Sequence, residues 1–232
     1  MQRHLIPELM DDPELDDRRH RRALQGLHRI NRVSGVERTI WPYLRTLFDR
    51  GATSLSMLDI ASGDGAIPIR LAGRAKACGR RLELVGCDVS PLARRVALER
   101  AAAAEVAMRY ESLDVTGGGL GGLGPFDVVL CNLFLHHLDE NAVVGVLRDA
   151  SRIATRLLIV NDLRRDRTNL LLARIVPRIL TRSDVVHVDA VRSVRAAFSS
   201  EELRSLASEA GLDRARVRHV FPRRMVLTWS PS

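Results

Sequence analysis

A short stretch that joins two apolar runs constrains the fold of this chain more than any other feature. The first run, which includes Leu58 and Ile60, ends in a tight turn that contains Gly63 and Gly65, and an Ala-rich segment of helical character follows. This order of strand, glycine turn and helix start lets backbone N–H groups approach a nucleotide-like ligand. The sequence therefore predicts a nucleotide-binding unit in this region.

An acidic residue at the end of the next apolar run narrows the choice of ligand. Asp88 closes the run 82–87 and stands at the end of the second predicted strand. An acid about 20 residues past such a glycine turn is placed to bind the 2′ and 3′ hydroxyls of a ribose. The glycine turn and the acid together indicate a cofactor that contains adenosine.

The spacing of the glycines separates two classes of cofactor. Nicotinamide enzymes use G-x-G-x-x-G, whereas the residue three positions after Gly65 is Pro68. From Asp59 the pattern is Asp-x-Ala-x-Gly-x-Gly, which resembles the first motif of the class I S-adenosylmethionine (SAM) methyltransferases, Asp/Glu-x-Gly-x-Gly-x-Gly. The departure is Ala61, where that family most often has Gly. We expect alanine to be tolerated, provided that the backbone there does not need a positive φ.

Three further segments strengthen the resemblance to this family. The segment that begins at Asp88 is similar to the one after the family's second strand, and Asp114 resembles the acid that accepts a hydrogen bond from the adenine amino group. Residues 126–132 resemble the fourth strand, which faces the transferred methyl group. The resemblance implies SAM as cofactor, S-adenosylhomocysteine (SAH) as its product, and a cofactor site made of Asp59, Ala61, Gly63, Gly65, Asp88, Val89, Asp114, Val115, Asn132 and Leu133.

Strand-like and helix-like segments alternate along the chain and predict its fold class. We expect parallel strands near 55–60, 82–88, 108–114, 126–132 and 156–161, with helices near 65–78, 91–104 and 140–154. Strands this apolar suit a parallel sheet that helices cover on both faces. The tail predicts two more strands with a turn at Pro222-Arg223, and the resemblance implies that the last strand is antiparallel. The predicted fold is α/β and Rossmann-like, with a seven-stranded, mostly parallel sheet.

The regions outside this sheet divide the chain. Helical spacing predicts helices near 16–33 and 36–49, and in family members such helices often cap the pocket; the alternative is that they only pack against the sheet. We therefore assign residues 1–50 to an N-terminal helical cap and residues 51–232 to a SAM-binding domain. Within that domain, residues 163–198 form an insertion on the substrate side, whose apolar face Pro177 interrupts. The glycine-rich stretch 117–124 is interpreted as a flexible connection.

Two adjacent histidines after the fourth strand are the candidate catalytic residues. Reacting groups lie beyond the carboxyl ends of the strands in an open α/β sheet, and imidazole can take a proton from a phenol or enol near neutral pH. His136 and His137 satisfy both conditions, although adjacent residues do not share a helix face, so only one is expected to reach the substrate. The alternative is that the His-His stretch only shapes the cofactor pocket. Further candidates near the pocket are Asn161, Asp162, His187 and Asp189.

The distribution of histidine and cysteine residues predicts a cytoplasmic protein without a metal site. His and Cys residues are too scattered for a recognisable metal-ligand spacing, so we expect a metal-independent reaction. Cys78, Cys87 and Cys131 form no C-x-x-C pair, which is typical of a reducing cytoplasm. We expect a cytoplasmic protein, because the acidic N-terminus lacks the apolar segment of a signal peptide and no apolar stretch is long enough to cross a bilayer.

The positive charge carries little information about partners. The formal net charge is +8, yet Lys76 is the only lysine, and such arginine bias often reflects a GC-rich genome. Arginine runs are usually solvated, and few aromatic residues interleave with them as single-stranded nucleic acids require. We expect no nucleic-acid partner, and a monomer or homodimer that acts on a small-molecule acceptor.

Three functions remain open, and one is favoured. Residues 7–13, the His-His stretch and the insertion together resemble bacterial methyltransferases of polyketide or quinone-like natural products. The favoured function is therefore SAM-dependent methylation of a hydroxyl, or a carbon, of an apolar acceptor such as a phenolic or polyketide natural product. The alternatives are an RNA or protein methyltransferase, and a non-catalytic partner protein with this fold. One version of the latter touches a membrane surface through residues 168–181 and their flanking arginines.

Overall fold

A seven-stranded sheet forms the centre of the computed structural model, which describes residues 1–12 and 14–231, the side chains of residues 11, 28, 31 and 32 excepted. The strand order is β3-β2-β1-β4-β5-β7-β6. β7 is antiparallel to both of its neighbours, and the remaining neighbouring strands pair in parallel. The strands are β1 (Ser54–Ile60), β2 (Arg81–Asp88), β3 (Met108–Ser112), β4 (Phe126–Asn132), β5 (Ala154–Leu163), β6 (Arg216–Val220) and β7 (Arg224–Trp229). The predicted fold class is confirmed.

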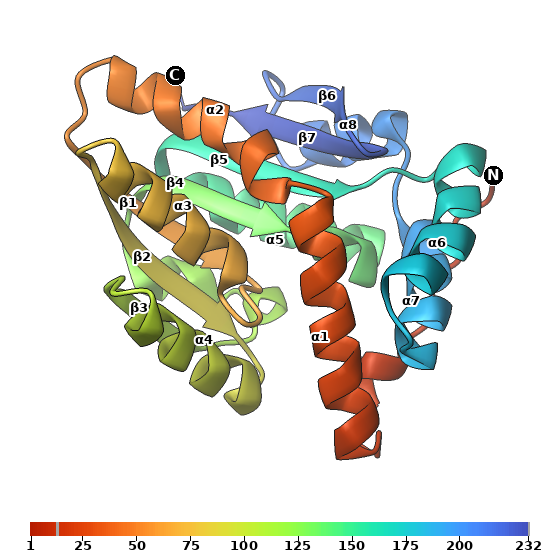
Figure 1. The fold of residues 1–232 in the computed structure, drawn as a ribbon. Coiled ribbons are helices and arrows are strands. Elements are labelled where there is room, and N and C mark those ends of the chain that lie inside the picture. Colours follow the sequence, from red (N-terminus) through yellow and green to blue (C-terminus); the bar gives the residue numbers. More distant parts are fainter. Residues whose placement is uncertain (13, 232) are drawn as a thin grey trace.

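Helices cover both faces of the sheet, because the central strands are apolar on both sides. In β1, Leu55 and Met57 pack into one cluster, whereas Leu58 and Ile60 pack into the other. The first cluster includes α2 (Val36–Asp49), α3 (Ala66–Ala77) and α4 (Pro91–Ala103), and the second includes α5 (Glu140–Ile153) and α8 (Ser200–Glu209). Figure 1 shows these two layers in front of and behind the strands.

A third group of helices lies at the carboxyl ends of the parallel strands (Figure 1). It consists of α1 (Asp17–Val33), α6 (Arg167–Leu180) and α7 (Asp184–Ala196), and each of the three contacts the other two. The predicted insertion at 163–198 supplies α6 and α7, and α1 comes from the N-terminal region. By contrast, α2 buries Ile40 and Leu44 against the sheet. The boundaries drawn at residues 50 and 163–198 stay predictions.

One local feature differs from the sequence-based expectation. The glycine-rich stretch forms two short 3₁₀ helices, η2 (Val115–Gly117) and η3 (Gly119–Leu123), which the buried Leu120 ties to the core. Pro177 lies inside α6, which continues to Leu180 and agrees with the helix expected near 168–181. A proline this close to the end of a helix removes only one backbone hydrogen bond near the terminus. In the part of the chain that the structure describes, no helix is long and apolar enough to cross a membrane.

Candidate functional site

A cavity of about 660 Å³ opens at the carboxyl ends of β1, β4 and β5. The glycine turn after β1 and the segment after β4 form its floor, and α1, α6, α7 and residues 8–10 surround it. The apolar walls come from Leu24, Leu27 and Ile30 of α1 and from Leu172, Val176 and Leu180 of α6. Ligands of open α/β sheets bind at this end of the strands, so we regard this cavity as the candidate site.

A second hollow, of about 840 Å³, lies at the other end of the sheet. Its lining includes the first residues of three strands, Arg81, Met108 and Phe126. None of the site residues expected from the sequence lines it. Its larger volume therefore does not make it the better candidate.

The glycine turn uses a left-handed backbone at three positions. Ala61, Gly63 and Gly65 have φ values of 51°, 53° and 66°. A Cβ on Gly65 would also lie 3.1 Å from the Cβ of Ala97, so glycine is required there for two reasons. Alanine was expected to be tolerated at position 61 only if the backbone there did not need a positive φ. The backbone of Ala61 does adopt a positive φ, which strains an L-residue.

Changing Ala61 to Gly is expected to raise the free energy of unfolding by about 0.5–1 kcal/mol. A left-handed conformation costs an L-residue about 1–2 kcal/mol, and the greater freedom of glycine in the unfolded chain returns about half of that gain. Urea denaturation measures the effect. Ala102→Gly, at an exposed position of the helix α4, is the control and should lower stability by about 1 kcal/mol. Equal destabilisation by both changes would contradict the interpretation.

Asp59 brings an unsatisfied carboxylate oxygen to the pocket. It lies at the end of β1, is buried, and accepts a hydrogen bond from Ser62 Oγ through Oδ2 at 2.7 Å. Its Oδ1 has no hydrogen-bond partner among the described residues. Burial, with smaller contributions from nearby acids, raises the pKa of Asp59 to about 7. A buried oxygen of this kind is suited to a ligand that donates a hydrogen bond.

The acids after β2 and β3 lie at neighbouring strand ends but outside the lining of the cavity. Asp88 accepts hydrogen bonds from the backbone N of Gly63 at 3.0 Å and of Ser90 at 2.9 Å, which ties the glycine turn to β2. Asp114 is exposed, and two hydrogen bonds from Thr116 lower its pKa. Gly65, Val89 and Val115 likewise lie outside the lining, whereas Asp59, Ala61, Gly63, Asn132, Leu133, His136 and His137 are part of it.

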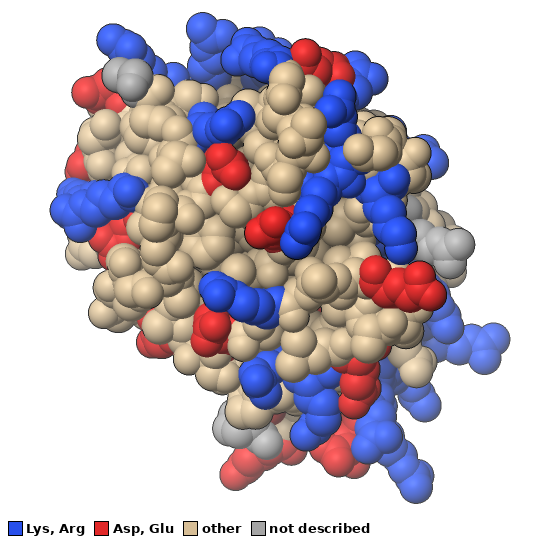
Figure 2. All heavy atoms as spheres, turned by 90° about the vertical axis from the view of Figure 1, so that its left-hand side faces the viewer, with Lys and Arg blue, Asp and Glu red and all other residues tan. Residues whose placement is uncertain are grey.

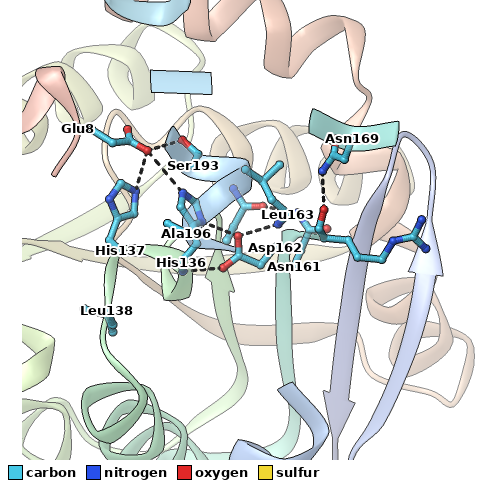
Figure 3. A network of polar contacts seen from close by, with 12 residues as sticks. Glu8, His136, His137, Leu138, Asn161, Asp162, Leu163, Asn169, Ser193 and Ala196 are labelled. Atoms are coloured by element: carbon cyan, nitrogen blue, oxygen red, sulfur yellow. Dashed lines mark hydrogen bonds and ion pairs between the residues drawn. The ribbon is translucent and has the colours of Figure 1, made fainter. Parts of the chain in front are cut away.

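His136 is held by a buried carboxylate of the neighbouring strand (Figure 3). It belongs to the 3₁₀ helix η4 (Leu135–His137), and its Nδ1 lies 2.6 Å from Asp162 Oδ1. The other oxygen of Asp162 accepts the backbone N–H of His136 at 3.1 Å. Burial alone would lower the pKa of His136, but the charge and hydrogen bond of Asp162, with Glu8, raise it above the usual value. Because Asp162 accepts the hydrogen bond of Nδ1–H, the neutral ring keeps its proton on Nδ1 and its lone pair on Nε2.

His137 differs from His136 in its electrostatic environment. The two rings are 4.3 Å apart between centroids, and both line the cavity. The two adjacent rings therefore face the same cavity, and the expectation that only one of them reaches the substrate stays a prediction. Burial, together with the neighbouring His136, lowers the pKa of His137 to about 3. His137 is therefore neutral near pH 7, and His136 is the better proton acceptor.

Glu8 reaches the histidines from the other end of the chain. Its Oε1 lies 3.8 Å from His136 Nε2 and 4.0 Å from His137 Nε2, and it also contacts Ser193 Oγ (Figure 3). The ligand atoms of Glu8, His136 and His137 lie within 4.8 Å of one another, close enough to hold a metal ion. The search for metal-ligand spacing in the sequence did not find these three residues, because Glu8 is far from the two histidines along the chain and meets them only in the folded structure. A metal-independent reaction stays a prediction.

Contacts with η4 and α7 hold the N-terminal residues over the pocket. Arg3 donates to the carbonyl oxygens of Leu138 and Ala196 at 2.5 and 2.6 Å. Asp189 accepts the backbone N–H groups of Leu9 and Met10 at 2.8 and 3.1 Å. Asp189 does line the cavity, as suggested, but its carboxylate is engaged by these amides. His187 lies outside the lining, and its Nε2 contacts the carbonyl of Thr181 at 2.8 Å.

Two more polar groups meet the cavity at the ends of β4 and β7. Asn132 Oδ1 accepts a hydrogen bond from Asn161 Nδ2 at 2.7 Å, which joins the ends of β4 and β5. Arg224, the first residue of β7, is buried against the cavity and donates to Ser34 Oγ at 3.0 Å. Nothing in the sequence pattern of the tail indicated Arg224 as a site residue, because the tail predicted only two strands and a turn.

The outward face of α6 is also apolar. Leu171, Ile175 and Ile179 are 54%, 47% and 76% exposed, while the opposite face of the helix lines the cavity. Contact with a membrane surface stays a prediction. On the face drawn in Figure 2, basic side chains are scattered from the centre to the margins and lie among acidic and uncharged ones. The absence of a nucleic-acid partner stays a prediction.

Comparisons with known proteins agree with this geometry. Residues 58–156 match a family model described as a methyltransferase domain. The plantazolicin methyltransferase BpumL, solved with SAH, is 14% identical with a TM-score of 0.71, covering 94% of this chain and 92% of that one. Magnesium protoporphyrin IX methyltransferase from Synechocystis PCC 6803, also solved with SAH, is 16% identical with a TM-score of 0.57, covering 95% and 90%.

A third structure is an O-methyltransferase family protein from Burkholderia thailandensis. It is 18% identical with a TM-score of 0.58, covering 76% of this chain and 51% of that one. The chain spans about half the length of several such structures. No curated protein matches the sequence. At these identities the likeness shows a shared fold.

Proposed function

We propose that the chain is a class I SAM-dependent methyltransferase and that it transfers the methyl group of SAM to a hydroxyl of an apolar, phenolic small molecule. The observation that supports this most is the buried pair of His136 and Asp162 at the pocket. A hydroxyl must lose its proton when it is methylated, and His136 Nε2 is available to accept it.

The residues around the glycine turn fit the cofactor. A Cβ on Gly63 would meet only open space, so the backbone of the turn is accessible, and Asp59 Oδ1 is a buried acceptor without a partner among the described residues. We assign Asp59, Ala61, Gly63, Gly65, Asn132 and Leu133 to the methionine part of SAM. Asp88 with Val89 would hold the ribose, and Asp114 with Val115 the adenine. When bound there, SAM supplies a methyl group activated by a sulfonium centre.

The chain's own residues orient the acceptor and move one proton. The leucine-rich walls of α1 and α6 exclude water and hold an apolar ring against the floor of the cavity. His136 Nε2 takes the hydroxyl proton as the oxygen becomes bonded to carbon. Asp162 keeps the proton on Nδ1 in place and stabilises the imidazolium that forms. These apolar walls are the reason for proposing a phenolic or polyketide acceptor.

Calorimetry of SAM binding tests the cofactor part of the proposal. We expect micromolar affinity for the parent and a loss of about 10- to 150-fold in Asp88→Ala, because hydrogen bonds to a charged group contribute about 1.5–3 kcal/mol. Asp213→Ala is the control, since Asp213 is an exposed acid near the C-terminal end of α8. Absence of SAM binding by a well-folded parent would refute the cofactor assignment.

A panel of phenols, quinols and polyketides tests the acceptor part. Labelled SAM is incubated with each compound, and mass spectrometry locates the transferred methyl group. Methylation on oxygen supports the proposal, and methylation on carbon would replace it with C-methylation. Tight SAM binding without any methylated product across the panel would count against a small phenolic acceptor.

A further inference from the structure

A buried guanidinium faces the pocket without a carboxylate partner. Arg224 begins β7, where the register pairs it with Leu163 at the carboxyl end of β5. Arg224 is one of the residues that line the cavity, and it is only 5% exposed. Nη2 donates to Ser34 Oγ at 3.0 Å, but Nη1 is buried and has no hydrogen-bond partner. Among the described residues, no carboxylate lies within ion-pair distance of Arg224.

This arrangement is unfavourable for folding and therefore calls for a ligand. Buried charges are almost always paired, because removing a charge from water is costly unless another group compensates. Burial lowers the pKa of Arg224 to about 10, and the charge of Asp162 opposes that shift, so the guanidinium stays protonated near pH 7. An unsatisfied polar group in a native structure is frequently explained by what binds there.

The acids that line the cavity form no ion pair with Arg224 among the described residues. Asp64 pairs with Arg100 at 2.8 Å, and Asp59 accepts a hydrogen bond from Ser62. Glu8 and Asp189 are engaged by the histidines, Ser193 and backbone amides, as described above. Arg224 is also the sole Arg or Lys among the described lining residues. A negative charge that satisfies it must therefore come from the ligand.

We propose that Arg224 binds a carboxylate of the methyl acceptor, so that the enzyme selects aromatic hydroxy acids over neutral phenols of the same shape. This inference rests on the proposed function and narrows its substrate class. A guanidinium N–H and a carboxylate form a strong, charge-assisted hydrogen bond. Arg224 and His136 line the same cavity, and Arg224 begins the strand that pairs with β5, which carries the partner of His136, Asp162. An acceptor whose hydroxyl and carboxylate share one ring system can address both.

Binding of a matched pair of ligands tests this selection without requiring turnover. The probes are a hydroxynaphthoate and its methyl ester, titrated by calorimetry into protein saturated with SAH. We expect the parent to bind the acid about 10- to 100-fold more tightly than the ester. Arg224→Met should abolish this preference, and Arg224→Lys should keep a weaker one. Arg223→Met is the matched control, because Arg223 lies outside the lining, and should leave the preference unchanged.

Each outcome supports or overturns the inference. Equal affinity for acid and ester, failure of the parent to bind the acid, or an unchanged preference in Arg224→Met would overturn it. If Arg224→Met does not fold, a weakened preference in Arg224→Lys with intact SAH binding still identifies the guanidinium as its source, and an undiminished preference there would overturn the inference. Normal binding in a separate titration of SAH into the same proteins separates this failure from failure of the proposed function. Absence of SAH binding would overturn both the proposed function and the inference about Arg224.

Discussion

Replacing His136 with glutamine is expected to lower kcat/KM for methyl transfer by about 10²- to 10⁴-fold, the usual contribution of a general base. Glutamine keeps a polar side chain of similar length but cannot accept the proton of the acceptor. SAM affinity should stay within about two-fold of the parent, because no cofactor contact is assigned to His136. Steady-state kinetics with the acceptor found in the panel, together with calorimetry of SAM, measure both quantities.

His137→Gln is the matched control for this prediction. The pKa of His137 is lowered to about 3 by burial and by His136, so its ring does not serve as a base near neutral pH. We expect its replacement to reduce kcat/KM by less than ten-fold. A larger loss in His137→Gln than in His136→Gln would reverse the assignment of the two rings.

The pH profile of the parent gives a second readout of the same role. A general base must be deprotonated, so kcat/KM should rise with pH and level off above the pKa of His136. Asp162 and Glu8 raise that pKa despite burial, so the midpoint should lie above the usual value for histidine. The rising limb should vanish in His136→Gln, and its persistence there would assign it to another group.

Replacing Asp162 with asparagine is expected to lower the free energy of unfolding by about 3 kcal/mol at pH 7. Its carboxylate accepts hydrogen bonds from His136 Nδ1, the backbone N of His136 and the backbone N of Leu163. An asparagine amide turns one oxygen into a donor and cannot accept all three. It also removes the negative charge near Arg224. Urea denaturation measures the difference, and Asp49→Asn is the control.

The control and the pH dependence make this prediction specific. Asp49 forms an exposed ion pair with Arg45, and its replacement should cost about 0.5 kcal/mol or less. In the parent, the folded-state pKa of Asp162 is lowered, so its contribution is present above the unfolded pKa and is lost as pH falls through the folded one. This acid-dependent part should be absent in Asp162→Asn. A change of less than about 1 kcal/mol would show that the carboxylate is not structurally important.

The strands, most helices and the glycine turn were predictable because each depends on neighbours in the chain. Apolar runs predicted the strands, and Ser199 with Glu202 forms the capping box of α8 that a helix start requires. The same local logic failed where a residue took its conformation from its surroundings. Ala61 adopts a left-handed backbone that its type does not favour, and Leu120 anchors a glycine-rich stretch that was expected to be a flexible connection.

The site, too, has features that follow from local sequence patterns and features that depend on the fold. The sequence by itself determined the fold class, the position of the glycine turn and the presence of two histidines beyond β4, since these follow from periodicity and short spacings. Only the tertiary structure decided that Glu8 from the N-terminus meets those histidines, that Asp162 holds one of them, and that Arg224 from the last strand enters the same cavity. Burial and charge then gave the two adjacent histidines pKa shifts of opposite sign. Such properties arise from distances through space, which the order of residues along the chain does not contain.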